Sequence, residues 1–88
     1  MPGDSGSVRA HIEIRVRVHG HLVWYLPGKR ERLQVTMQTG ATVGDILETL
    51  EVPAAEILAI SVGGRRVQLD CGLQDGDTVE LIPVLSGG

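Results

Sequence analysis

The sequence predicts a small two-layer α+β domain, in which one main helix covers a mixed sheet of four to five strands. Several segments alternate apolar and polar residues with a period of two, which indicates strands with one buried face. A single segment has apolar residues at helical spacing, which indicates one amphipathic helix. The chain has 88 residues, of which 42% are hydrophobic and 22% are charged, and this suits one globular domain and little else.

Two strands are expected in the first half of the chain. In His11–Val18, isoleucine and valine alternate without a break with charged and polar residues. Arg32–Met37 shows a similar alternation, and the two segments are predicted to form an antiparallel hairpin. The connection His19–Glu31 is too long for a tight turn, so we expect a wide loop with one helical turn around Leu22–Leu26.

The helix is expected at Val43–Glu51. Thr42 precedes this segment and Asp45 follows three residues later, an arrangement that resembles a capping box. The apolar residues of the segment recur at helical spacing, and Pro53 prevents the helix from continuing. The predicted helix is long enough to cover one face of a small sheet.

Three more strands are expected after the helix, at Ile57–Val62, Arg65–Val67 and Thr78–Val84. Gly63 and Gly64 separate the first two and predict a tight hairpin. In the last strand, Val79 and Leu81 should face the helix, and Pro83 should weaken the pairing because it has no N–H. If the first and last strands pair centrally, the topology is a β-grasp, the ubiquitin-like architecture.

The chain is predicted to divide into three parts. Residues 1–8 are interpreted as a flexible polar leader, residues 9–84 as the domain, and residues 85–88 as a flexible tail that ends in Gly-Gly. No stretch reaches the ~18 apolar residues of a membrane span, and the leader has no apolar signal-peptide core. We therefore expect a cytoplasmic location and no membrane partner.

Composition argues against several other functions. The formal net charge of −3 gives no electrostatic support for a nucleic-acid partner. His19 and His21 have no third ligand at useful spacing, so no metal site is expected. Cys71 is the only cysteine and is interpreted as incidental. Seven of the eight basic residues are interpreted as part of a solvated, mixed-charge surface rather than a phosphate-binding stripe: Arg15, Arg17, Lys29, Arg30, Arg32, Arg65 and Arg66.

The strongest functional signal lies in the C-terminal segment. Leu73–Gly88 contains an Asp-Gly-Asp turn, a hydrophobic strand with a proline, and a terminal Gly-Gly. This segment resembles the end of the ThiS/MoaD family of ubiquitin-like sulfur carriers. Gly40–Val43 at the start of the helix and the hairpin Val62–Arg65 also match the family, so the resemblance covers roughly residues 9 to 88.

The resemblance implies a protein co-substrate with no catalytic residues, not an enzyme; at most it is the small non-catalytic subunit of a molybdopterin synthase. A ubiquitin-activating-type enzyme would use ATP to adenylate Gly88. A sulfur donor such as a cysteine desulfurase or rhodanese would then convert it to a thiocarboxylate. Gly87 and Ser86 would keep the tail slim enough to thread into the adenylation site. The chain itself is expected to bind no cofactor.

The acceptor of the sulfur follows from the branch of the family. The length of the connection His19–Glu31 favours the molybdopterin branch, in which a MoaE-like synthase subunit receives the sulfur. The alternatives are a thiamin thiazole carrier that serves a thiazole synthase, and a ubiquitin-like modifier conjugated through Gly88. A β-grasp binding module that is never activated is a third alternative.

Apolar residues beside the tail are expected to contact the activating enzyme. Ile82, Val84 and Leu85 lie at the end of the last strand and are predicted to form this docking surface. Trp24 and Tyr25, in the long connection, are interpreted as packing over an open end of the core; the alternative is an anchor for a partner.

Overall fold

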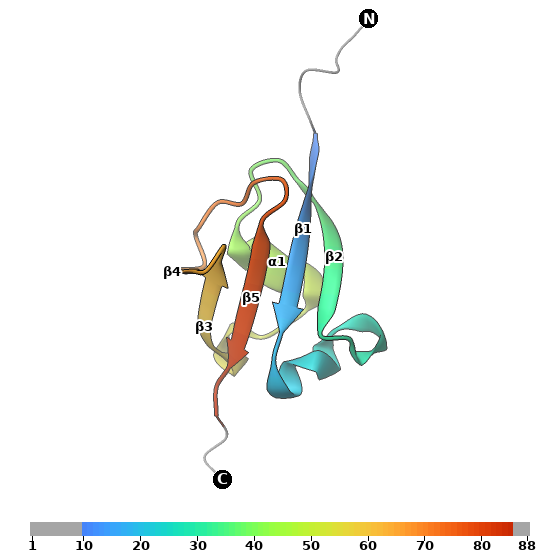
Figure 1. The fold of residues 1–88 in the computed structure, drawn as a ribbon, viewed down its shortest axis with the longest axis vertical. Helices are drawn as coiled ribbons and strands as arrows, with labels where there is room; N and C mark the ends of the chain where they lie inside the picture. The colour runs from blue at the N-terminus through green and yellow to red at the C-terminus, as the bar shows by residue number, and fades with distance from the viewer. Residues whose placement is uncertain (1–9, 86–88) are drawn as a thin grey trace, which may run out of the picture.

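The computed structural model describes residues 10–85, and the predicted strands and helix are all present in it (Figure 1). The elements in chain order are β1 (His11–Val18), the 3₁₀ segments η1 (Gly20–Tyr25) and η2 (Pro27–Lys29), β2 (Arg32–Gln38), α1 (Val43–Leu50), the 3₁₀ segment η3 (Ala54–Glu56), β3 (Ile57–Val62), β4 (Arg65–Val67) and β5 (Thr78–Pro83).

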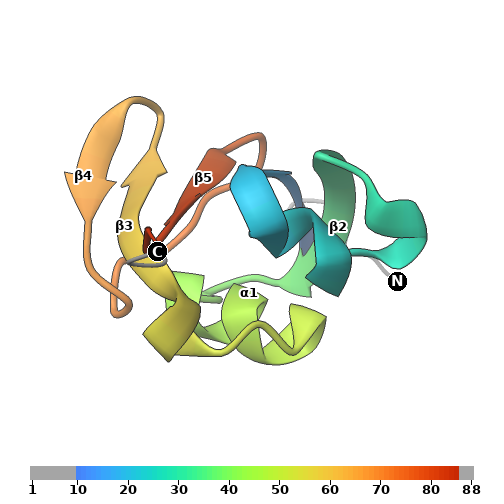
Figure 2. The ribbon, with the colours of Figure 1, turned by 90° about the horizontal axis from the view of Figure 1, so that it is seen from below.

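The sheet has the strand order β2-β1-β5-β3-β4, so the first and last strands lie in its middle. β1 pairs with β2 in antiparallel fashion and with β5 in parallel fashion, while β3 is antiparallel to both β5 and β4. The helix α1 lies across one face of the sheet (Figure 2). This arrangement confirms the predicted β-grasp fold.

The core forms between that face and α1. Alternate residues of β1 are almost completely buried, as the period-two pattern predicts. Val43, Ile46 and Leu47 of α1 are buried against the sheet. Val79 and Leu81 of β5 are both 0% exposed, which confirms that they face the helix. The opposite face of the sheet carries the polar residues and is called the open face below.

The capping box predicted for α1 is present. Thr42 Oγ1 accepts a hydrogen bond from the Asp45 N–H at 3.3 Å, and the Asp45 carboxylate accepts one from the Thr42 N–H at 2.9 Å. The helix ends at Leu50, one residue earlier than predicted, because Glu51 takes the left-handed conformation with φ of 58°.

The connection between β1 and β2 differs from the prediction. It contains two 3₁₀ segments rather than one helical turn. Leu22 and Leu26 fill the end of the core, whereas Trp24 is 65% exposed, so its interpretation as a core-covering residue is wrong. The Nζ atom of Lys29 lies 4.2 Å from the centre of the Trp24 ring, which is a cation–π contact.

Smaller differences concern the strand ends. β2 continues one residue beyond the prediction, to Gln38, and β5 stops at Pro83 rather than Val84. Among the helices in residues 10–85, none has the length and apolar character needed to span a membrane.

Candidate functional site

The candidate site is the point where the chain leaves the end of β5. Because β5 lies between β1 and β3, the C-terminal segment starts from the middle of the sheet rather than from an edge (Figure 1). Pro83 pairs with Ile57, and the Val84 N–H donates a 3.0 Å hydrogen bond to the backbone oxygen of Glu56. The chain is therefore fixed up to Val84.

The predicted adenylation and threading residues lie beyond this point. Ser86, Gly87 and Gly88, like the predicted leader at residues 1–8, are outside the described residues. Leu85 is the last described residue and is 86% exposed.

The start of η1 packs against the same end of β5. The His19 Nε2–H donates to the Glu80 carboxylate at 2.5 Å, and the His21 Nε2–H donates to the Glu56 carboxylate at 2.7 Å. Gly20 lies between the two histidines with a positive φ of 57°, and a Cβ atom there would be 3.1 Å from Cγ of Pro83. His19 and Gly20 thus join the β1–β2 connection to β5, the strand that carries the tail, and His21 joins it to η3.

The two histidines pair with different carboxylates, His19 with Glu80 and His21 with Glu56. No group of three or more potential metal-ligating side chains occurs within residues 10–85. His19 also affects Glu80: the hydrogen bond from the imidazole lowers the pKa of this carboxyl below its ordinary value, and Arg17 and the Ser61 hydroxyl act in the same direction.

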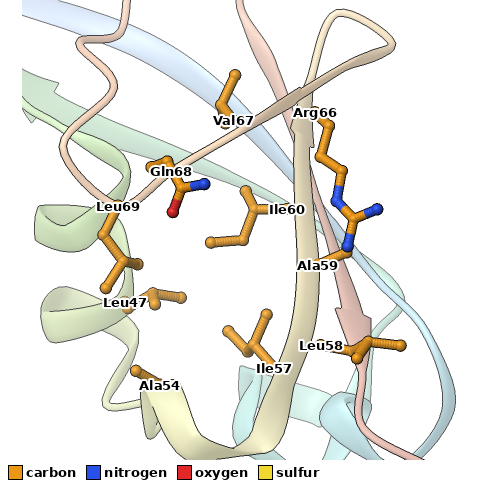
Figure 3. A pocket seen from close by; sticks show the side chains of 10 residues that line it. All are labelled: Leu47, Ala54, Ile57, Leu58, Ala59, Ile60, Arg66, Val67, Gln68 and Leu69. Atoms are coloured by element: carbon orange, nitrogen blue, oxygen red, sulfur yellow. The ribbon is translucent and has the colours of Figure 1, made fainter.

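Apolar side chains surround the exit on the open face. Ile82 follows the buried Leu81, so it points to the opposite side of the sheet, next to its strand partner Ala59. A β-bulge interrupts the pairing between Ile57 and Ala59. Leu58, in this bulge, is 58% exposed, and Figure 3 shows it on the opposite side of β3 from Ile57.

We call Leu58, Ile82, Val84 and Leu85 the exit patch. Ile82, Val84 and Leu85 were predicted as docking residues from the sequence, and their docking role stays a prediction. Leu58 was missed, because the bulge that exposes it has no recognisable sequence signal.

A second feature is a cavity of about 220 Å³ between α1, β3 and the segment that follows β4 (Figure 3). Leu47, Ile57, Ile60 and Leu69 point toward it, whereas Arg66 lies on the far side of β3. These four side chains supply apolar contact, Gln68 adds an amide to the lining, and none of the five is a nucleophile, acid or base. The thiol of Cys71 is elsewhere, partly buried, and donates a 3.5 Å hydrogen bond to the Gly72 backbone oxygen.

A β-grasp sheet with a central last strand and an apolar patch beside its exit defines a ubiquitin-like protein. The chain belongs to the Mut7-C ubiquitin family, whose family model matches residues 11–87. This finding confirms the ubiquitin-like, ThiS/MoaD-like assignment made from the sequence. No curated protein sequence matches the chain.

Solved structures of ubiquitin-like proteins have the same fold. Small archaeal modifier protein 1 from Haloferax volcanii is 17% identical, with a TM-score of 0.71 over 84% of this chain and 99% of that chain. Urm1 from Trypanosoma brucei is 20% identical, with a TM-score of 0.67 over 92% of this chain and 100% of that one. The complex of subunits 1 and 2 of molybdopterin-converting factor from Helicobacter pylori contains a match of 22% identity, with a TM-score of 0.57 over 88% and 100%.

Proposed function

We propose that this chain is a ubiquitin-like protein co-substrate whose Gly88 carboxylate is adenylated and then converted to a thiocarboxylate. The observation that carries the proposal is the central position of β5, whose end is held by β3, η3 and the start of η1. A tail that starts from such a fixed point can be presented to a partner together with the exit patch. The proposal requires that Gly88 be the end of the mature chain.

Glycine at the last two positions suits this chemistry. A terminal carboxylate must enter a narrow site and approach ATP closely, and glycine places no side chain in the way. One carboxylate oxygen would attack the α-phosphorus of ATP, so that pyrophosphate leaves and an acyl adenylate forms. The terminal sulfur of a persulfide would next attack the acyl carbon, and AMP would leave. This attack forms an acyl disulfide with the donor cysteine. A second thiol of the sulfur donor would then attack the sulfur of that cysteine, which breaks the S–S bond inherited from the persulfide, releases the thiocarboxylate and leaves a disulfide on the donor.

In this scheme the chain contributes a reactive end and a docking surface, and the partners contribute catalysis. ATP is bound by the activating enzyme, and we propose no cofactor for the chain itself. The exit patch would contact that enzyme while Ser86 and Gly87 thread into its active site. Desolvation of the exposed Leu58 and Leu85 side chains would favour binding.

The molybdopterin branch is our preferred version of the proposal. The Helicobacter pylori match is one subunit of a two-subunit molybdopterin-converting factor, which supports a synthase subunit as the acceptor here. A protein-modifier function is the second candidate, because small archaeal modifier protein 1 has the same fold. Sulfur delivery to thiamin thiazole remains a further alternative within the carrier class.

One experiment separates these possibilities. The chain is expressed with its activating enzyme and its intact mass is measured, with a variant that lacks Gly88 as the matched control. A mass shift that corresponds to one oxygen replaced by sulfur, absent from the control, supports the carrier. Adducts with other proteins that survive thiol treatment support the modifier. An unmodified mass in the presence of enzyme and ATP contradicts the proposal.

A further inference from the structure

Three arginines that are separate in the sequence lie together on the open face. Arg15 and Arg17 are on β1, and Arg32 is the strand partner of Arg17 on β2. With Gln34, the strand partner of Arg15, and with Thr78 of β5, they line a hollow of about 370 Å³. We call these five residues the arginine hollow. The strand register therefore gathers three arginines at one place on a face that also carries Glu13 and Glu80, so the surface remains mixed in charge, as expected from the sequence.

Arg17 and Arg32 face each other across the β1–β2 pair. Like charges directly opposite each other on neighbouring strands destabilise a sheet. The carboxylates of the same face are already engaged: Glu13 accepts hydrogen bonds from Gln34 at 2.8 Å and from Thr36 at 2.9 Å, and Glu80 accepts one from His19. Within the described part of the chain, Arg15 and Arg32 form no ion pair with any of these groups.

On this face of β5, Glu80 lies between the arginine hollow and the exit patch. Arg17 is the strand partner of Glu80, which precedes Ile82 by two residues on the same face of β5. A partner that covers Ile82 and extends across the sheet would therefore reach the guanidinium groups. Among the described carboxylates of this face, Glu80 lies beside Arg17, whereas no ion pair joins Arg15 or Arg32 to Glu13 or Glu80. A partner that carries negative charge would therefore complement Arg15 and Arg32.

We propose that the arginine hollow binds a carboxylate-rich segment of the activating enzyme, an inference that rests on the proposed function. Guanidinium groups form forked hydrogen bonds with carboxylates, so an Asp- or Glu-bearing segment fits their geometry. The activating enzyme is chosen because its step is common to the carrier and the modifier functions. A nucleic acid is disfavoured, because the net charge of the chain is −3 and the basic cluster is small.

The test is ATP–pyrophosphate exchange by the activating enzyme, with the full chain as the varied substrate. The variant Arg15→Glu/Arg32→Glu should raise the KM for the chain by about tenfold or more and leave kcat unchanged. Arg15→Gln/Arg32→Gln, which removes charge but retains size, should give a smaller rise in the same direction. For the wild type, KM should increase with salt, and for the charge-reversal variant it should not.

The control is Arg65→Glu/Arg66→Glu on β4, which changes the charge equally outside the hollow and should leave KM near the wild-type value. An unchanged KM for the Arg15/Arg32 variants, or an equal rise for the control, would overturn the inference. So would binding of a single-stranded oligonucleotide that the Arg15/Arg32 variants abolish. If the wild-type chain supports no exchange at all, the proposed function fails instead, and the two failures are distinguishable.

Discussion

Leu81 and Ile82 are neighbours on β5 whose side chains point to opposite faces of the sheet. Replacing each by alanine should therefore change the free energy of unfolding by different amounts. Leu81 is 0% exposed and pairs with Ile60 and Val18 on the adjacent strands. Leu81→Ala removes three carbon atoms, at about 0.8 kcal/mol each for lost burial. The cavity left behind raises the expected loss to about 3–4 kcal/mol, because the surrounding sheet is held in register and collapses only in part.

That loss is large for a domain of this size, whose total free energy of unfolding is roughly 4–13 kcal/mol. Ile82→Ala removes the same number of carbon atoms from the open face and should cost at most about 1 kcal/mol. Urea unfolding followed by circular dichroism measures both variants, and the m-value should stay constant. Equal destabilisation by the two substitutions would refute the assignment of the faces of β5.

Three other predictions follow from the same geometry. Ile82→Asp should raise the KM for activation by about 30-fold, the factor that corresponds to a 2 kcal/mol hot spot, while the chain stays folded. Leu69→Asp, which replaces an exposed leucine outside the exit patch, should leave the KM unchanged. Equal effects of the two substitutions would contradict a docking role for Ile82. Gly63→Ala should lower the free energy of unfolding by about 1 kcal/mol, because alanine is strained at a positive φ. Gly20→Ala should lower it by roughly 1 kcal/mol more, because the new Cβ would also crowd Pro83. Equal losses in urea unfolding would show that the contact between Gly20 and β5 is loose. The pKa of Glu80 is lowered in the folded chain, so the stabilising effect of the Glu80 carboxylate is complete above the unfolded-state pKa of about 4.5 and is lost as the pH falls through the lower folded-state pKa. Glu80→Gln should remove this part of the acid destabilisation. Identical pH profiles of the urea midpoint for the wild type and the variant would contradict the pairing with His19.

Local sequence patterns predicted the elements well because local forces form them. The alternation in His11–Val18 predicted the observed bounds of β1, and the pair Thr42 and Asp45 located the start of α1. The helix end was one residue off, since the left-handed conformation of Glu51 is unusual for a residue other than glycine.

The parts of the site that the sequence did not predict depend on long-range register. His19 and Glu80 are 61 positions apart, and no local pattern indicates that the β1–β2 connection folds back onto β5. The exposure of Leu58 depends on a bulge, and the position of Arg32 opposite Arg17 depends on how the hairpin is aligned. Trp24 was misassigned for a related reason, because Leu22 and Leu26 already fill the space it was expected to cover.

The position of β5 explains why docking and tail presentation would act together. A strand at the edge of a sheet is held on one side and frays easily, whereas β5 is bonded to β1 and β3 on both sides. The exit of the tail therefore keeps a fixed distance from the exit patch and the arginine hollow. A terminal Gly-Gly has no side chain by which an activating enzyme could recognise it. Under the proposed function, discrimination between this chain and other ubiquitin-like chains must come from the open face, where apolar contact and charge are combined.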